Sequence, residues 1–227
     1  ECPLGALRVL PGLNTLKNAI KKAEKQGIKN IYLEKGIHKI GSLEELTKTN
    51  EWHPPNSLTI QSSLTIIGAS RTECIVIGGF TIVEGHVNIK TMTIRDSSVA
   101  GIAGAYESSF HLENLFIDQC DVGVIIMEES TMHNCEISSS KTSGVVLMSG
   151  KLTITGRFNL IRNNCKKYQP RLEFGLKAKT GTYIEIQSPT TNILELMCTN
   201  NGGGGNYGGG GKIEQVFCIG KESKIPW

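Results

Sequence analysis

The sequence predicts an all-β protein: a single-stranded right-handed parallel β-helix, which is a solenoid, with a short N-terminal capping helix. Two observations predict this fold. From Leu58 onward the chain consists of short β-prone runs that follow one another too closely for crossover helices, which disfavours doubly wound α/β folds and α/β barrels. The same region contains an internal repeat with a period in the twenties, which is typical of a solenoid.

The repeat becomes visible when residues 92–98, 115–121 and 135–141 are aligned on their central isoleucines. Ile94, Ile117 and Ile137 recur 23 and 20 residues apart, and we expect Leu160 to continue the series. A second apolar run with a glycine follows each motif, at 99–102, 122–125, 143–146 and 174–176. Each coil therefore contains at least two strands with a turn between them.

Stacked coils place equivalent side chains above one another. The repeat predicts one column of Arg95, Asp118 and Ser138 and a second column of Ser97, Cys120 and Ser140. The first column brings opposite charges onto neighbouring strands, and we interpret it as cross-strand pairing that stabilises the stack.

The N-terminal helix is predicted from its apolar face and its ends. Leu16, Ile20 and Ala23 fall on one side, Asn14 or Thr15 can cap the start, and Gly27 follows the end. Short strands at 31–33 and 37–40 come next, followed by a loop over 52–57 that contains Pro54 and Pro55.

We expect one β-helix domain over residues 1–227. The N-terminal cap and first coil cover about 14–57, the coils cover 58–200, a Gly-rich loop covers 201–212, and the last strand and C-terminal tail cover 213–227. The Gly-rich stretch lacks the Lys-Ser/Thr ending of a phosphate loop, which excludes that motif. Whether the tail around Pro226 and Trp227 caps the last coil or inserts into a partner stays open.

The composition argues against several classes of function. A net charge of +3, from 24 basic and 21 acidic residues, and dispersed basic residues disfavour nucleic-acid binding. No apolar stretch approaches the roughly 18 residues of a membrane span. The chain begins at Glu1, so a removed targeting signal and secretion stay open, and we expect a soluble protein, intracellular or associated with a virion.

The seven cysteines are dispersed and form no CxxC pair, so structural zinc is not expected. We interpret them as reduced thiols, several of them buried, and leave open a bond between Cys198 and Cys218. The five histidines show no HxH pair and no triad-like spacing to an aspartate. We therefore interpret them as surface or turn residues; they are His38, His53, His86, His111 and His133.

Several segments resemble a known family. Residues 31–40, after the helix, resemble the capped first coil of pectin-lyase-like right-handed β-helix proteins. Residues 64–68, 74–79, 141–146 and 200–208 resemble a poorly characterised branch of β-helix repeat proteins from algae and large DNA viruses of algae. The resemblance covers about 14–220. It implies the fold, and it does not carry a function.

The acid and metal clusters of the family's carbohydrate-active members cannot be matched residue by residue. The nearest constellation is Asp96, Asp118 and Asp121 with Arg95, on neighbouring coils. Three dispersed carboxylates supply too few oxygens for calcium without help from carbonyls and water. We expect no metal and no cofactor.

Two functions follow from this. The first is a non-catalytic structural or binding module that presents a β-helix surface to a protein or glycan partner, at a virion or cell surface. The alternative is a polysaccharide lyase, hydrolase or epimerase that acts on an acidic polysaccharide, with Asp96, Asp118, Asp121 and Arg95 as its candidate catalytic residues. Self-association through the coil ends is a further open possibility.

Overall fold

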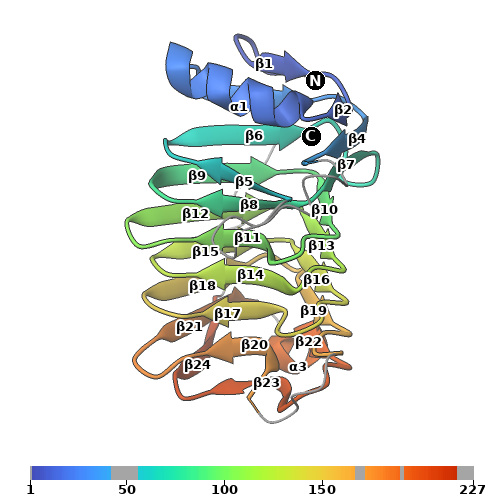
Figure 1. The fold of residues 1–227 in the computed structure, drawn as a ribbon. Helices are drawn as coiled ribbons and strands as arrows, with labels where there is room; N and C mark the ends of the chain where they lie inside the picture. Colours follow the sequence, from blue (N-terminus) through green and yellow to red (C-terminus); the bar gives the residue numbers. More distant parts are fainter. Residues whose placement is uncertain (1, 42–55, 167–171, 190–191, 219–227) are drawn as a thin grey trace.

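The chain winds into a right-handed parallel β-helix. The computed structural model describes residues 2–41, 56–166, 172–189 and 192–218. From residue 30 onward each coil passes in turn through three sheets, which we call sheets A, B and C. The strands pair in parallel with the equivalent strands of neighbouring coils. Figure 1 shows the coils stacked along one axis, with sheet C in front and sheet B at the right.

The strand bounds follow the sheets. Sheet A contains β1 (Leu7–Val9), β3 (Asn30–Leu33), β6 (Leu64–Gly68), β9 (Gly85–Lys90), β12 (Ser108–Glu113), β15 (Ser130–His133), β18 (Lys151–Thr155), β21 (Tyr183–Ser188) and β24 (Lys212–Phe217). Sheet B contains β2 (Gly12–Leu13), β4 (Gly36–Lys39), β7 (Cys74–Ile77), β10 (Thr93–Arg95), β13 (Phe116–Asp118), β16 (Glu136–Ser138), β19 (Leu160–Arg162) and β22 (Cys198–Thr199). Sheet C contains β5 (Ser57–Ile60), β8 (Gly79–Ile82), β11 (Ala100–Gly104), β14 (Val122–Ile126), β17 (Val145–Leu147), β20 (Phe174–Ala178) and β23 (Gly205–Gly209).

The strand pairing confirms most of the predicted repeat and corrects it at one position. Ile94, Ile117 and Ile137 stack in register inside sheet B. The next member is Ile161, which pairs with Ile137, whereas Leu160 pairs with Glu136 and is partly exposed. The prediction for Leu160 was wrong because this coil is one residue longer, and a shift of one residue moves a side chain to the opposite face of a strand.

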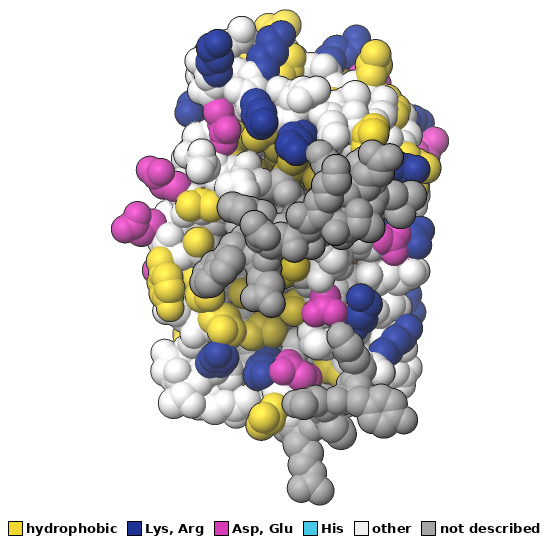
Figure 2. Space-filling view, in the orientation of Figure 1, with side chains coloured by type: hydrophobic (Ala, Val, Ile, Leu, Met, Phe, Trp, Pro, Cys, Tyr) yellow, Lys and Arg dark blue, Asp and Glu magenta, His cyan; other side chains and the backbone are white. Residues whose placement is uncertain are grey.

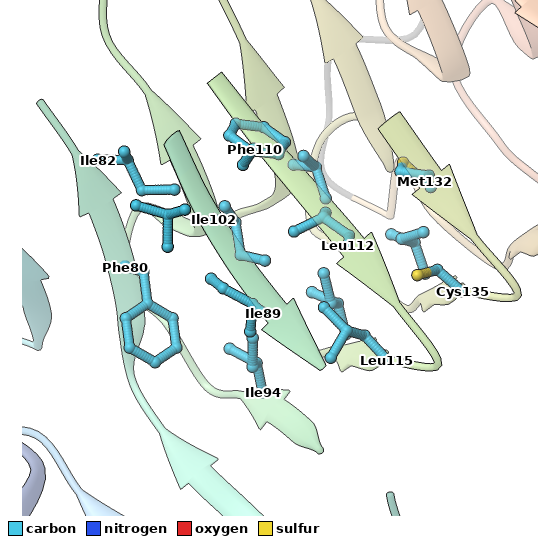
Figure 3. Close-up of a cluster of buried hydrophobic side chains, with 14 of the residues drawn as sticks. Phe80, Ile82, Ile89, Ile94, Ile102, Phe110, Leu112, Leu115, Met132 and Cys135 are labelled. Carbon is cyan, nitrogen blue, oxygen red and sulfur yellow. The ribbon is translucent and has the colours of Figure 1, made fainter. Parts of the chain in front are cut away.

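The core is built from stacked aliphatic side chains, as the low aromatic content predicts. Figure 3 shows one part of it, in which Ile89, Ile94, Ile102 and Leu112 from three sheets meet in the interior of the coils. Phe80 is among the few large aromatic side chains that are fully buried. Parallel strands covered by neighbours on both sides favour this composition.

A column of glycines marks the start of sheet C. Gly101 and Gly123 lie between the paired residues Ala100–Val122 and Ile102–Val124, so they stack, and Gly79, Gly144 and Gly175 continue the column. A Cβ atom on Gly101 would lie 2.6 Å from Cγ2 of Ile117. These positions are therefore glycine because the corner between sheets B and C has no room for a side chain.

Helix α1 (Thr15–Gln26) covers the first coil, as predicted. It buries Leu16, Ala19, Ile20 and Ala23 against the core and ends at Gly27 in a left-handed conformation. Asn14 precedes the helix but its side chain does not cap it; Oδ1 accepts a hydrogen bond from Gly41 N at 3.0 Å. A shorter helix, α3 (Ile193–Met197), lies beside β19 and β22 near the other end.

The Gly-rich stretch differs from the expected loop. Residues 205–209 form strand β23, which pairs in parallel with β20, and β24 already begins at Lys212. The expectation of a loop over 201–212 was wrong here because backbone hydrogen bonds to the preceding coil do not need a side chain. The predicted loop over 52–57 lies largely outside the described residues, as do Pro226 and Trp227.

The cysteines are free thiols. Cys198 is buried and Cys218 is partly exposed, with no bond between them. Burial raises the pKa of Cys120 to about 12, so this thiol stays protonated and behaves as a small apolar side chain.

Candidate functional site

The predicted acidic residues lie on the outer face of sheet B and in the turn that follows it. Arg95, Asp118 and Ser138 stack in register, which confirms the predicted column. Arg95 does not pair with Asp118, however. Its Nε donates to Oδ2 of Asp96 at 2.9 Å, and Asp96 occupies a left-handed turn position directly after β10.

The other two carboxylates have different neighbours. Asp118 Oδ2 accepts a hydrogen bond from Gln119 Nε2 at 2.9 Å, and Asp121 lies 3.7 Å from the ammonium group of Lys141. Among the described residues, no group of three His, Cys, Asp or Glu side chains has the arrangement of a metal site. The structure thus brings Arg95, Asp96 and Asp118 onto one surface, and a catalytic role for them stays a prediction.

A second charged cluster on sheet B was not predicted. The carboxylate of Glu136 lies between two guanidinium groups, at 2.8 Å from Arg71 Nη2 and 2.6 Å from Arg162 Nη2. Arg71 comes from the loop before β7; its carbonyl accepts a hydrogen bond from Thr93 and its guanidinium lies over the ring of Phe116. These contacts hold the loop against the sheet, and the cluster of one carboxylate and two guanidinium groups keeps a net charge of +1.

The outer face of sheet A carries a row of polar, uncharged side chains. In successive coils the strand pairing aligns Thr65, Asn88, His111, Thr131 and Thr153. All five side chains are partly exposed. We call these five residues the polar row; one hydrogen-bonding side chain stands on each of five neighbouring strands, β6 to β18.

Hydrogen bonds join neighbouring coils on this face. Asn88 Nδ2 donates to the Thr65 hydroxyl at 3.4 Å, and His111 Nδ1 lies 2.6 Å from the Thr131 hydroxyl. Two further histidines beside the polar row contact a hydroxyl group of the next coil in the same way. His86 Nδ1 lies 2.8 Å from the Ser109 hydroxyl, and His133 Nδ1 lies 2.9 Å from the Thr155 hydroxyl. A hydroxyl has one donor and two acceptor positions, so these side chains keep hydrogen-bonding capacity toward solvent.

The histidine prediction is therefore confirmed in part. His86, His111 and His133 lie on an outer sheet face, although on strands rather than in turns. His38 is fully buried in the core, so the prediction of a surface position was wrong for it. His53 lies outside the described residues.

The cations that flank the polar row are paired. Lys90 Nζ lies 2.7 Å from Glu113 on the next coil, and Lys151 Nζ lies 2.8 Å from Glu185 on the next coil. Each pair spans neighbouring strands and cancels its own charge. The central part of sheet A therefore presents neutral hydrogen-bonding groups with balanced ion pairs beside them.

The outer face of sheet C differs from both others. Ala103, Ile125 and Val146 stack in register on its outer side, and Val83 is 39% exposed. Figure 2 shows hydrophobic side chains over the middle strands of this face, with Lys and Arg side chains above and below them. The outward register of sheet C is thus apolar over three strands only, between Thr81 on one side and Lys177 on the other.

The polar row was accessible to sequence reasoning but was missed. The repeat offset that aligns Ile94 with Ile117 also aligns Asn88 with His111, which again lie 23 residues apart. Acidic residues, the usual signal of a carbohydrate-active site, lie on the face of sheet B instead. No sequence pattern predicts that Arg71 lies over Phe116, because the loop of Arg71 is outside the repeat.

Comparison with known proteins adds one structural neighbour. A substituted pectate lyase from Xanthomonas campestris is similar, with a TM-score of 0.45 and 14% identity over 92% of this chain and 80% of that chain. No known family and no curated protein matches the sequence. Among the described helices, none has the length and apolar character needed to cross a membrane.

Proposed function

We propose that the protein is a non-catalytic binding module whose outer face of sheet A binds a glycan at a virion or cell surface. The polar row carries this proposal. An extended polymer that crosses the strands meets one amide, imidazole or hydroxyl group per coil, because neighbouring strands lie about 4.7–4.9 Å apart. Such a regular series of donors and acceptors on a flat surface suits the hydroxyl groups of a polysaccharide. The branch of algal and viral β-helix proteins stays a prediction.

Removing hydroxyl groups from the polar row tests this function. The double substitution Thr131→Val/Thr153→Val keeps the β-branched shape and removes two hydrogen-bonding groups. Net hydrogen bonds contribute about 0.5–1.5 kcal/mol each, so we expect glycan affinity to fall roughly five- to hundredfold. A glycan array followed by titration of the glycans that bind measures the loss.

The matched control is Thr59→Val/Thr81→Val. These residues point outward in register on sheet C, and their substitution should leave binding unchanged. Equal loss in both variants would contradict the assignment to sheet A, and the absence of any glycan ligand would contradict the function.

One observation favours an enzyme as the second candidate. Arg95 and Asp118 lie in register on the exposed face of sheet B. A site there that cleaves an acidic polysaccharide would require such neighbouring side chains. That candidate predicts cleavage of a uronic-acid polymer, abolished by Asp118→Ala. The binding module predicts no cleavage and no effect of Asp118→Ala on glycan affinity.

A further inference from the structure

The charges around the polar row restrict the ligand class. Unpaired cations on a protein surface attract acidic polymers and raise their association rate. Lys90 and Lys151, the cations beside the row, are each paired with a glutamate from the next coil. A negatively charged ligand would have to compete with these carboxylates for both ammonium groups.

The row itself is neutral at neutral pH. Burial lowers the pKa of His111, with a further contribution from the charge of Lys90, so the imidazole is uncharged there. The hydrogen bond from Lys90 holds the pKa of Glu113 below its usual value, so this carboxylate stays ionised and the ion pair persists. The remaining members of the row are threonine hydroxyls and an asparagine amide.

His133, at the margin of the polar row, has a hydrogen-bond partner at each ring nitrogen. The Asn134 side chain accepts a hydrogen bond from Phe158 N at 3.1 Å through Oδ1, which directs its Nδ2 group toward His133 Nε2 at 2.9 Å. Nε2 therefore acts as an acceptor, and Nδ1 donates to Thr155.

Carboxylates also border the face. Glu84, Glu107, Glu128 and Glu129 precede β9, β12 and β15 in the turns from sheet C, whereas Arg157 follows β18 on the other side. An acidic polymer would meet repulsion along the first border.

We propose that the ligand of sheet A is an uncharged, extended polysaccharide chain that lies along the solenoid axis, across strands β6 to β18. This inference rests on the proposed function and adds the charge and direction of the ligand. An axial chain follows the polar row from coil to coil, whereas a chain parallel to the strands would meet the row only once.

Salt and chain length test the two parts of this inference. We expect neutral oligosaccharides to bind in preference to uronic-acid or sulfated ones, with affinity that changes less than twofold between about 50 mM and 500 mM salt, because screening affects charged pairs. Affinity should rise with chain length until the ligand spans the five strands of the row and then level off. Isothermal titration with a neutral oligosaccharide series and its oxidised, uronate-containing counterpart gives both results.

A charge-neutral double variant sharpens the test. Lys90→Gln/Glu113→Gln removes one ion pair and leaves the net charge unchanged, so binding of the neutral ligand should change less than threefold. Thr131→Val/Thr153→Val should weaken it roughly tenfold.

The outcomes separate the inference from the proposed function. Tighter binding of acidic glycans that is lost at high salt and in Lys90→Gln/Glu113→Gln would overturn the inference while sheet A remains a glycan-binding face. Affinity that stops rising at one or two sugar units would overturn the axial direction. Binding of no glycan would overturn both.

Discussion

At the scale of single residues, His38 is a histidine inside an apolar column. It pairs in register with Val76 on the next coil and is fully buried. Nε2 lies 2.9 Å from the Glu34 carbonyl, and Nδ1 has no hydrogen-bond partner among the described residues. A proton on Nδ1 would be buried without an acceptor, and burial accordingly lowers the pKa of His38.

This arrangement predicts loss of stability in acid. The unfolded chain binds a proton at His38 near pH 6.5, and the folded chain binds it only at lower pH. The free energy of unfolding therefore falls as the pH drops below about 6.5. Above that value His38 is neutral in both states and does not change the stability.

Replacing His38 isolates its contribution. The free energy of unfolding should fall between pH 7.5 and pH 5, and we expect this fall to be smaller in His38→Leu than in the wild type. Urea denaturation of both proteins at both pH values measures it. His111 shifts in the same direction, so part of the dependence remains. An equal loss in variant and wild type would show that His38 is not protonated on unfolding.

At the scale of elements, the glycine column fixes how closely sheets B and C approach. A Cβ atom on Gly123 would overlap Cγ2 of Ile137 and the carbonyl oxygen of Gly144. Ile137 is fully buried, and the contacting atom of Gly144 belongs to the backbone of the next coil. Neither can move away without disturbing the packing of the coils.

We expect Gly123→Ala to lower the free energy of unfolding by about 1–3 kcal/mol through overpacking, as measured by urea denaturation. Gly5→Ala is the control. Gly5 has a positive φ of 77° but no atom within 4 Å of an added Cβ, so only the backbone cost of a left-handed conformation applies, about 1–2 kcal/mol. A Gly123→Ala variant as stable as the wild type would show that the corner has room.

The repeat explains how far prediction from the sequence reaches. Apolar periodicity placed the columns of Ile94 and of Arg95, because inward and outward positions alternate along a strand. It failed at Leu160, where a coil is one residue longer than expected, and at β23, a Gly-rich strand that pairs with β20 through its backbone. The ion pairs of Arg95 and Arg71 depend on turn and loop conformations that the repeat does not determine.

At the scale of the whole molecule, one solenoid presents three faces whose chemistry differs because each sheet has its own outward columns. The polar row of sheet A extends over five coils, and the lysines beside it are paired with glutamates. Sheet C carries three apolar residues in register, and sheet B binds its own loop through Arg71 and Glu136. This segregation of chemistry is the reason for assigning glycan binding to sheet A.

Histidine footprinting with a bound glycan tests that assignment most directly. His111 and His133 lie on sheet A and react with an imidazole-modifying reagent, read out by mass spectrometry, while Asp118 on sheet B reports through carboxyl labelling. We expect a saturating glycan ligand to protect both histidines and to leave Asp118 labelled as before. Unprotected histidines, or protection of Asp118 instead, would contradict it.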